Sequence, residues 1–379
     1  MRIRVRKLTM NMTSGRIRYF DIAKGIAILC VILGHTALTA RGYVPSHAAD
    51  WTIAVCFSFH MALFFMLSGY FMHPERCFRW MREFRELILT YAFTACMVVL
   101  WAVIFSAWLY PDDQTRAGLR VAFDWIEAAA YGAGDFSPLT LWPVGNRIGA
   151  LWFLLALFWA HLLLHAIYRL PWRPAWVALC FLIGYFSARM VWLPLSVQSG
   201  MCAVLFLYIG RLAREYKVLE WVWAHWPIWV ALFAVWGCAI VWFDGFSLAM
   251  NQWGGRPVLA FLGSLCGTLC VIGIARGIDR YAAPVGGLLA LAGRSSLALL
   301  CVHLVEDNVF PWGWVLPWLQ ATFPRVPLTL LFFVVRLVLD VALAALLYRI
   351  PVIDAWFYPQ LAKARGTGSR AGDRERAGA

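Results

Sequence analysis

Long apolar segments recur along this chain, and their length constrains the fold more than any other feature. A helix needs about 20 apolar residues to cross the hydrocarbon core of a bilayer, and in lipid its backbone must satisfy its own hydrogen bonds. Hydrophobic residues make up 62% of the 379 residues and charged residues 14%, so a soluble fold could not bury this surface. We therefore expect an all-α polytopic membrane protein with about ten transmembrane helices. The segments are approximately 20–40, 51–72, 87–109, 148–168, 174–193, 196–212, 221–243, 257–275, 287–310 and 327–349.

Basic residues are distributed unevenly between these segments. Most of the 33 Lys and Arg residues lie in alternate connections and near the two ends of the chain, which is the asymmetry expected of cytoplasmic loops. Both termini are therefore predicted to be cytoplasmic. The topology also explains the formal net charge of +13, so no nucleic-acid partner is expected. The predicted organisation is a basic cytoplasmic N-terminus over 1–19, a single transmembrane domain over 20–350 and a disordered basic cytoplasmic tail over 351–379.

The first apolar segment carries three ionisable residues, Asp21, Lys24 and His35. Ionisable side chains are costly inside a bilayer and are functional candidates by default. Lys24 and His35 are eleven positions apart. At about 100° and 1.5 Å per residue, their side chains leave the same helical face about 16 Å apart along the axis. One stripe would therefore carry a cation near one membrane surface and a titratable base near the middle of the membrane.

Five motifs, in family order along the chain, resemble those of the acyltransferase-3 superfamily of bacterial inner-membrane O-acyltransferases. The first resembles the R/K-x10-H signature, and the sequence around it looks most like the fucose-4-O-acetylase-type branch. The last has Leu299 where a Tyr is frequent, a departure that concerns packing more than chemistry. The motifs are Lys24-x10-His35, FFMLSGY over 64–70, Arg79-x-x-Arg82, LWFL over 151–154 and GRSSLALLCVH over 293–303.

This resemblance implies a multi-pass O-acyltransferase (EC 2.3.1) of the bacterial inner membrane. It would move an acetyl or other acyl group from cytoplasmic acyl-CoA, chiefly acetyl-CoA, to a hydroxyl of a cell-surface or secreted glycan or its lipid-linked precursor. Acyl transfer needs a base for the hydroxyl proton and donors that stabilise the oxyanion. His35 is the expected general base, with Lys24 also in the catalytic site. His60 or His303 would donate to the oxyanion or position the acceptor.

The residues expected to bind the acyl-CoA donor are Lys24, Ser68, Arg79 and Arg82. Arginine side chains match phosphate oxygens bidentately, so the two arginines are suited to the phosphates of coenzyme A. Other interpretations remain open for these residues. The arginines could contact lipid headgroups, Ser68 and Gly69 could allow close helix packing, and His60 could be a buried histidine bonded to a neighbour.

Further polar residues lie in the last two apolar segments. Glu306 follows His303 by three positions and could orient its imidazole, or form a structural ion pair. Arg336 and Asp340 are spaced i, i+4, so we expect them to pair with each other and thereby lower the cost of burying both charges.

No metal site is expected. His161 and His165 have the i, i+4 spacing of metal ligands, but no third ligand is evident. The ten cysteines include no CxxC pair and no Cys/His cluster.

The longest external connection runs from 111 to 147 and combines carboxylates with aromatic residues, among them Trp125 and Tyr131. Aromatic faces stack on sugar rings and carboxylates accept hydroxyl protons, so this loop is suited to a carbohydrate. A merely solvated loop is the alternative.

Two other functions compete with the enzyme. In a proton-coupled transporter or flippase of a glycan or small molecule, the intramembrane His, Lys and Asp residues would form a proton relay. A non-catalytic membrane partner in glycan assembly would keep the helices but tolerate loss of His35. Acceptor-dependent release of free coenzyme A would distinguish the enzyme from a carrier.

Overall fold

The computed structural model describes residues 17–109, 114–350 and 352–353. These residues form helices, turns and loops with two isolated β-bridges, which confirms the all-α class for this part of the chain. The predicted N-terminal region 1–19 and tail 351–379 lie outside the described residues, except for 17–19 and 352–353. The α-helices are α1 (Arg18–Tyr43), α2 (His47–Phe57), α3 (His60–Phe71), α4 (Trp80–Glu83), α5 (Leu89–Leu109), α6 (Gln114–Tyr131), α7 (Trp152–Ile167), α8 (Arg173–Ser187), α9 (Val197–Glu215), α10 (Val218–Ala224), α11 (Trp226–Val241), α12 (Pro257–Tyr281), α13 (Ala283–Arg294), α14 (Ser296–Val309), α15 (Trp312–Thr322) and α16 (Leu328–Tyr348).

All ten predicted segments coincide with helices, but the helices differ in their ability to span a membrane. In the described part of the chain, seven helices are long and apolar enough to span a membrane. This count treats α2 with α3 as one helix and α4 with α5 as another. Two more segments are bent pairs: α10 with α11 bends by 107°, and α13 with α14 by 67°. The remaining helix, α8, has 15 residues. The structure thus has seven to nine candidate spans, and the count of ten stays a prediction.

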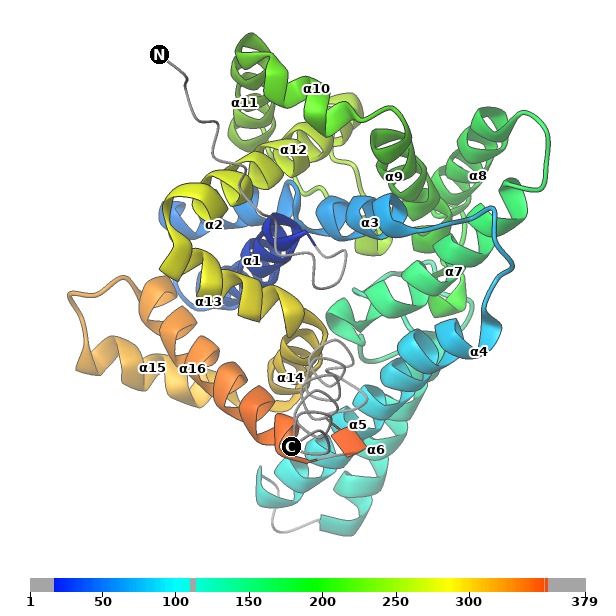
Figure 1. The fold of residues 1–379 in the computed structure, drawn as a ribbon. Coiled ribbons are helices and arrows are strands. Elements are labelled where there is room, and N and C mark those ends of the chain that lie inside the picture. Colours follow the sequence, from blue (N-terminus) through cyan, green and yellow to red (C-terminus); the bar gives the residue numbers. More distant parts are fainter. Residues whose placement is uncertain (1–16, 110–113, 351, 354–379) are drawn as a thin grey trace, which may run out of the picture.

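Helix α1 lies near the centre of the arrangement (Figure 1), where it contacts α2, α3, α12, α13, α14 and α16. Two glycines allow its first half to lie very close to α13. A Cβ on Gly25 would collide with the backbone carbonyl of Leu289, and a Cβ on Gly293 would collide with that of Asp21. Small residues permit such close approach of helices in membranes. The first half of α1, including Lys24, is therefore held against α13.

The same kind of contact fixes α3 against α9. A Cβ on Gly69 would collide with the backbone of Leu207, and one on Gly210 with the backbone of Met66. Of the two interpretations of Ser68 and Gly69, helix packing is thus confirmed for Gly69. The neighbouring Ser68 instead lines a cavity.

The outward sides of several helices are apolar, whereas charged side chains occur on inward faces. Helices α5, α8, α11 and α16 expose large side chains such as Leu100, Phe186, Val230 and Val338, which suits contact with lipid tails. Arg336, on the inward face of α16, is fully buried. Its charge therefore has to be balanced within the protein.

Candidate active site

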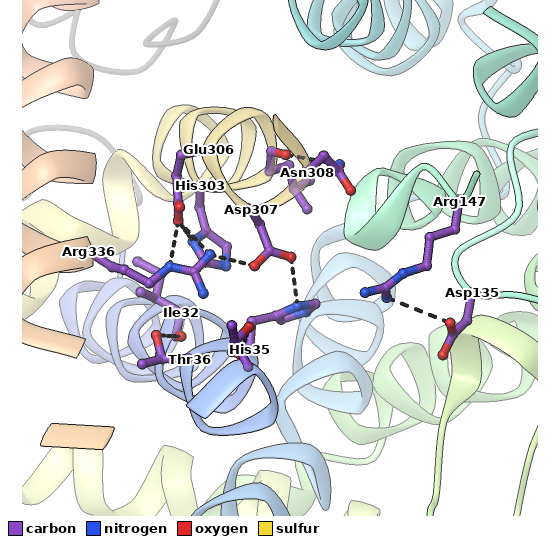
Figure 2. A network of polar contacts seen from close by, with 12 residues as sticks. Ile32, His35, Thr36, Asp135, Arg147, His303, Glu306, Asp307, Asn308 and Arg336 are labelled. Carbon is purple, nitrogen blue, oxygen red and sulfur yellow. Dashed lines mark hydrogen bonds and ion pairs between the residues drawn. The ribbon is translucent and has the colours of Figure 1, made fainter. Parts of the chain in front are cut away.

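Six ionisable side chains from three helices meet inside the helical arrangement, and we call them the histidine cluster. Figure 2 labels all of them except Asp340. One comes from the second half of α1, three from α14 and two from α16. Helices α14 and α16 both contact α1 and each other, which brings together residues far apart in sequence. The members of the cluster are His35, His303, Glu306, Asp307, Arg336 and Asp340.

His35 contacts the carboxylate of Asp307. Its Nδ1 lies 3.4 Å from Oδ2 of Asp307, and its side chain remains 15% exposed. A carboxylate at this nitrogen favours the tautomer that carries its proton on Nδ1, which leaves Nε2 as the basic nitrogen. The ring of His303 stands edge-on to that of His35, with centroids 5.5 Å apart. The structure thus brings together two of the three predicted catalytic histidines.

His303 is fully buried between two carboxylates. Its Nδ1 lies 2.8 Å from Oε1 of Glu306 and 3.2 Å from Oδ2 of Asp340, so this nitrogen carries a proton. Its Nε2 is buried with no hydrogen-bond partner among the described residues. Both contacts considered for Glu306 are observed, because it contacts the imidazole of His303 and also forms an ion pair with Arg336.

Arg336 connects the carboxylates of α14, and the expected pairing of Arg336 with Asp340 is wrong. Its Nη2 lies 2.6 Å from Glu306 and 2.5 Å from Asp307, and its Nε donates to Glu306 at 2.8 Å. Asp340 instead contacts His303. Neighbours on one helix face need not pair when another helix offers better-placed partners, and the arginine fork can engage two carboxylates at once.

Two groups of ligand atoms in the cluster are close enough to hold a metal ion: those of His35, His303 and Asp307, and those of His303, Glu306 and Asp340. Arg336 already engages Glu306 and Asp307. Its fixed positive charge would repel a cation at either place. The donor set is thus suited to an ion-pair network rather than a metal.

His60 lies beside the cluster. Its Nδ1 lies 2.7 Å from the carbonyl oxygen of Cys56. His60 is therefore a buried histidine bonded to a neighbour, as in the alternative interpretation. The ring of Phe57 packs on both His60 and His35, with centroid distances of 5.1 and 5.8 Å. His60 is thus linked to His35 through an aromatic ring.

A cavity of about 490 Å³ opens near the beginning of α1, and we call it the basic cavity. It is lined by all four predicted donor-binding residues, which lie in α1, in α3 and in or next to α4. Two further arginines, Arg76 and Arg294, line it, together with three histidines and two carboxylates: His73, His161, His165, Glu83 and Glu86. His35 is not among its lining residues. The donor residues predicted from separate motifs therefore share one place, while their role in binding stays a prediction.

One group in the basic cavity was not predicted. Oγ of Ser68 lies 2.7 Å from Nε2 of His161, and Nδ1 of His161 lies 2.7 Å from Oε2 of Glu83. In the sequence, the i, i+4 spacing of His161 and His165 on α7 was typical only of metal ligands. Ser68 and Glu83 come from other helices, so local spacing gives no signal for this contact.

A second cavity, of about 520 Å³, opens near the other end of α1, and we call it the distal cavity. Trp51, Asp50, Asp135 and Asp244 line it, together with Phe57, whose ring packs on His35. Figure 2 shows Asp135 and its ion-pair partner Arg147 on the side of His35 away from Arg336.

The carbohydrate-facing role expected for the loop over 111–147 is wrong for Tyr131. This residue is fully buried, and its hydroxyl donates to the backbone carbonyl of Trp192. It cannot stack on a ligand, because packing inside the protein already covers its ring.

Comparison with known proteins gives one match. The acyltransferase-3 family model, described as an acyltransferase domain, matches residues 17–349. No curated protein and no solved structure matches the chain. The matched range includes the histidine cluster and the lining of both cavities.

Proposed function

The chain belongs to the acyltransferase-3 family, and from this premise we propose that it transfers an acetyl group from acetyl-CoA to a hydroxyl of a glycan or its lipid-linked precursor. Family membership and the apolar helices make it a multi-pass membrane acyltransferase. The proposal adds the donor, the acceptor and His35 as general base. It also places the chain in a bacterial inner membrane, with ten spans and both termini in the cytoplasm.

The observation that carries the proposal is the contact between a carboxylate and the partly exposed ring of His35. Asp307 holds Nδ1, so Nε2 is available to take the proton of a hydroxyl. The carboxylate of Asp307 places negative charge beside the His35 ring. That charge stabilises the imidazolium formed when His35 accepts a proton.

The basic cavity supports coenzyme A as the donor carrier. Arg76, Arg79, Arg82 and Arg294 line it together with Lys24, and arginine forks bind phosphate oxygens well. Its volume of about 490 Å³ lies within the range of small-molecule sites. Under the proposed topology this cavity opens to the cytoplasm, where acyl-CoA is available.

The distal cavity supports a hydroxyl-bearing acceptor. Trp51 offers an aromatic face, and Asp50, Asp135 and Asp244 offer carboxylates that accept hydrogen bonds from sugar hydroxyls. Phe57 both lines this cavity and packs on His35, so an acceptor bound there would contact a residue that touches the proposed base.

Turnover by the purified protein, or by membranes containing it, tests the proposal. Radiolabelled acetyl-CoA is supplied with and without a glycan or lipid-linked glycan fraction, and free coenzyme A and labelled glycan are measured. His35→Gln should lower turnover by at least about 100-fold, the usual size of a general-base contribution. His225→Gln, which changes an exposed histidine outside the cluster and both cavities, is the matched control.

The same assay separates the enzyme from a proton-coupled transporter, which the buried cluster of histidines and carboxylates would also suit. A transporter would release no coenzyme A in response to an acceptor. Turnover of His35→Gln near that of the wild type would remove His35 from the mechanism.

A further inference from the structure

Three side chains in the basic cavity have the arrangement of a nucleophile, a base and an orienting acid. We propose that Ser68 takes the acyl group from the thioester as a covalent ester, with His161 as its base and Glu83 as the residue that positions His161. The inference rests on the proposed function, because it requires acyl-CoA in this cavity. It adds a covalent intermediate and a second catalytic site to that function.

The contacts follow the order that such a step requires. Oγ of Ser68 lies 2.7 Å from Nε2 of His161, which is hydrogen-bond distance for proton transfer. On the other side of the ring, Nδ1 of His161 lies 2.7 Å from Oε2 of Glu83. The carboxylate holds the proton on Nδ1 and leaves Nε2 to accept the serine proton.

The three residues are held by different parts of the fold. Ser68 precedes Gly69, which fixes α3 against the backbone of α9. His161 lies on α7, and Glu83 ends α4, immediately before a π-helical turn over Phe84–Ile88. A π-helical turn within a helix is frequently found at functional sites. The side chains of His161 and Glu83 are 13% and 18% exposed, so they are shielded from bulk water but open to the cavity.

Cationic groups in the same cavity are suited to the charge that develops during attack. Lys24 and Arg294 both line it. The Nε of Arg294 is buried without a hydrogen-bond partner among the described residues. An oxyanion formed from the thioester carbonyl would give such a donor a partner and would be stabilised by the positive charge.

The chemical step is balanced without any further reactant. The Ser68 oxygen forms a bond to the thioester carbonyl carbon while its proton passes to Nε2 of His161. The tetrahedral intermediate then collapses, the carbon–sulfur bond breaks, and the thiolate of coenzyme A takes the proton from His161. The products are acyl-Ser68, free coenzyme A and neutral His161. In the second half-reaction a hydroxyl takes the acyl group, and its proton restores the Ser68 hydroxyl.

The proposed acylation site is separate from the histidine cluster. Ser68 is eight residues beyond His60 on α3, or about 12 Å along the axis, and His60 lies beside His35. His35 does not line the basic cavity. Two half-reactions remove the need for coenzyme A and the acceptor to occupy the protein together, because coenzyme A leaves before the hydroxyl arrives.

Labelling without an acceptor tests the proposal directly. The purified full-length protein is incubated with acetyl-CoA labelled in the acetyl group, quenched in acid and digested, and the peptides are examined by mass spectrometry. We expect one acetyl group per protein on Ser68. Ser68→Ala should lose the label, and His161→Gln should slow labelling at least about 100-fold. Ser137→Ala and His225→Gln, outside the cavity, should label as the wild type does.

Two further variants separate chemistry from folding. Ser68→Cys keeps a nucleophile, so it should carry a thioester that neutral hydroxylamine removes. His35→Gln should still acquire the label, because His35 does not line the basic cavity.

The outcomes distinguish this inference from the proposed function. If the wild type transfers acetyl groups to an acceptor but carries no label, and Ser68→Ala keeps at least half of that turnover, direct transfer occurs and the inference is overturned. If acetyl-, propionyl- and succinyl-CoA all give neither label nor turnover, the proposed function fails as well.

Discussion

Replacing Asp307 by Asn is the sharpest test of the histidine cluster. The change keeps the shape of the side chain but removes the charge that faces Nδ1 of His35 at 3.4 Å. At an effective dielectric constant of about 20, unit charges at that distance interact by about 5 kcal/mol. Arg336, at 2.5 Å from the other Asp307 oxygen, offsets part of this field. We expect about 3 kcal/mol to be lost from stabilisation of the imidazolium, which is a fall in turnover of roughly 100-fold.

Stability should change less than activity in this variant. Arg336 keeps both of its contacts with Glu306, at 2.6 and 2.8 Å, so the guanidinium is not left without a carboxylate. We expect a loss of about 1–3 kcal/mol in the free energy of unfolding. Glu306→Gln is the comparison, because Glu306 contacts Arg336, His303 and the indole of Trp312. It should cost about 3–5 kcal/mol, as expected when a buried ion pair is broken.

The assay combines initial rates of coenzyme A release at saturating donor and acceptor with thermal unfolding of the same detergent-purified samples. His225→Gln again serves as the control. Our reasoning about the cluster would be refuted if Asp307→Asn were folded and kept more than about a third of wild-type turnover. It would also be refuted if the variant lost activity only in proportion to the amount of folded protein.

Three further predictions concern other parts of the molecule. The double variant Arg79→Ala/Arg82→Ala should raise KM for acetyl-CoA about 10- to 100-fold, because phosphate contacts are lost. Arg325→Ala, in an exposed loop, should leave this KM unchanged. An unchanged KM in the double variant would argue against the basic cavity as the donor site. Trp51→Ala should raise KM for the acceptor and leave KM for acetyl-CoA unchanged in steady-state kinetics with each substrate varied in turn. A raised KM for acetyl-CoA with an unchanged KM for the acceptor would show that the distal cavity binds the donor. Gly69→Leu should destabilise the protein by at least about 3 kcal/mol and lower its Tm, because α3 and α9 would be forced apart; an unchanged Tm would contradict the close packing of these helices.

Local properties of the sequence predicted much of this architecture. Each apolar segment became helical, as one helix or as a pair of helices, since length and hydrophobicity depend on neighbouring residues alone. Pro227 offers a local signal for the bend before α11, because proline fits the first turn of a helix. The break between α13 and α14 at Ser295 carries no comparable signal, so one long span was expected there.

The residues of the candidate site were named by motif, but their grouping was not. Lys24 and His35 lie on one helix with the expected spacing, yet one lines the basic cavity and the other belongs to the histidine cluster. Asp307 was missed because its contact with His35 joins α14 to α1.

The sequence alone therefore determined which residues form helices in lipid and which side chains are candidates for catalysis or binding. Both properties depend on composition and spacing over a few helical turns. Only the tertiary structure decided which charges pair. Arg336 contacts Glu306 and Asp307 rather than Asp340, and Ser68 contacts His161, 93 residues away. Helical periodicity fixes the direction of a side chain but not the helix that it faces, and in a bundle of similar apolar helices that choice depends on the packing of the whole chain.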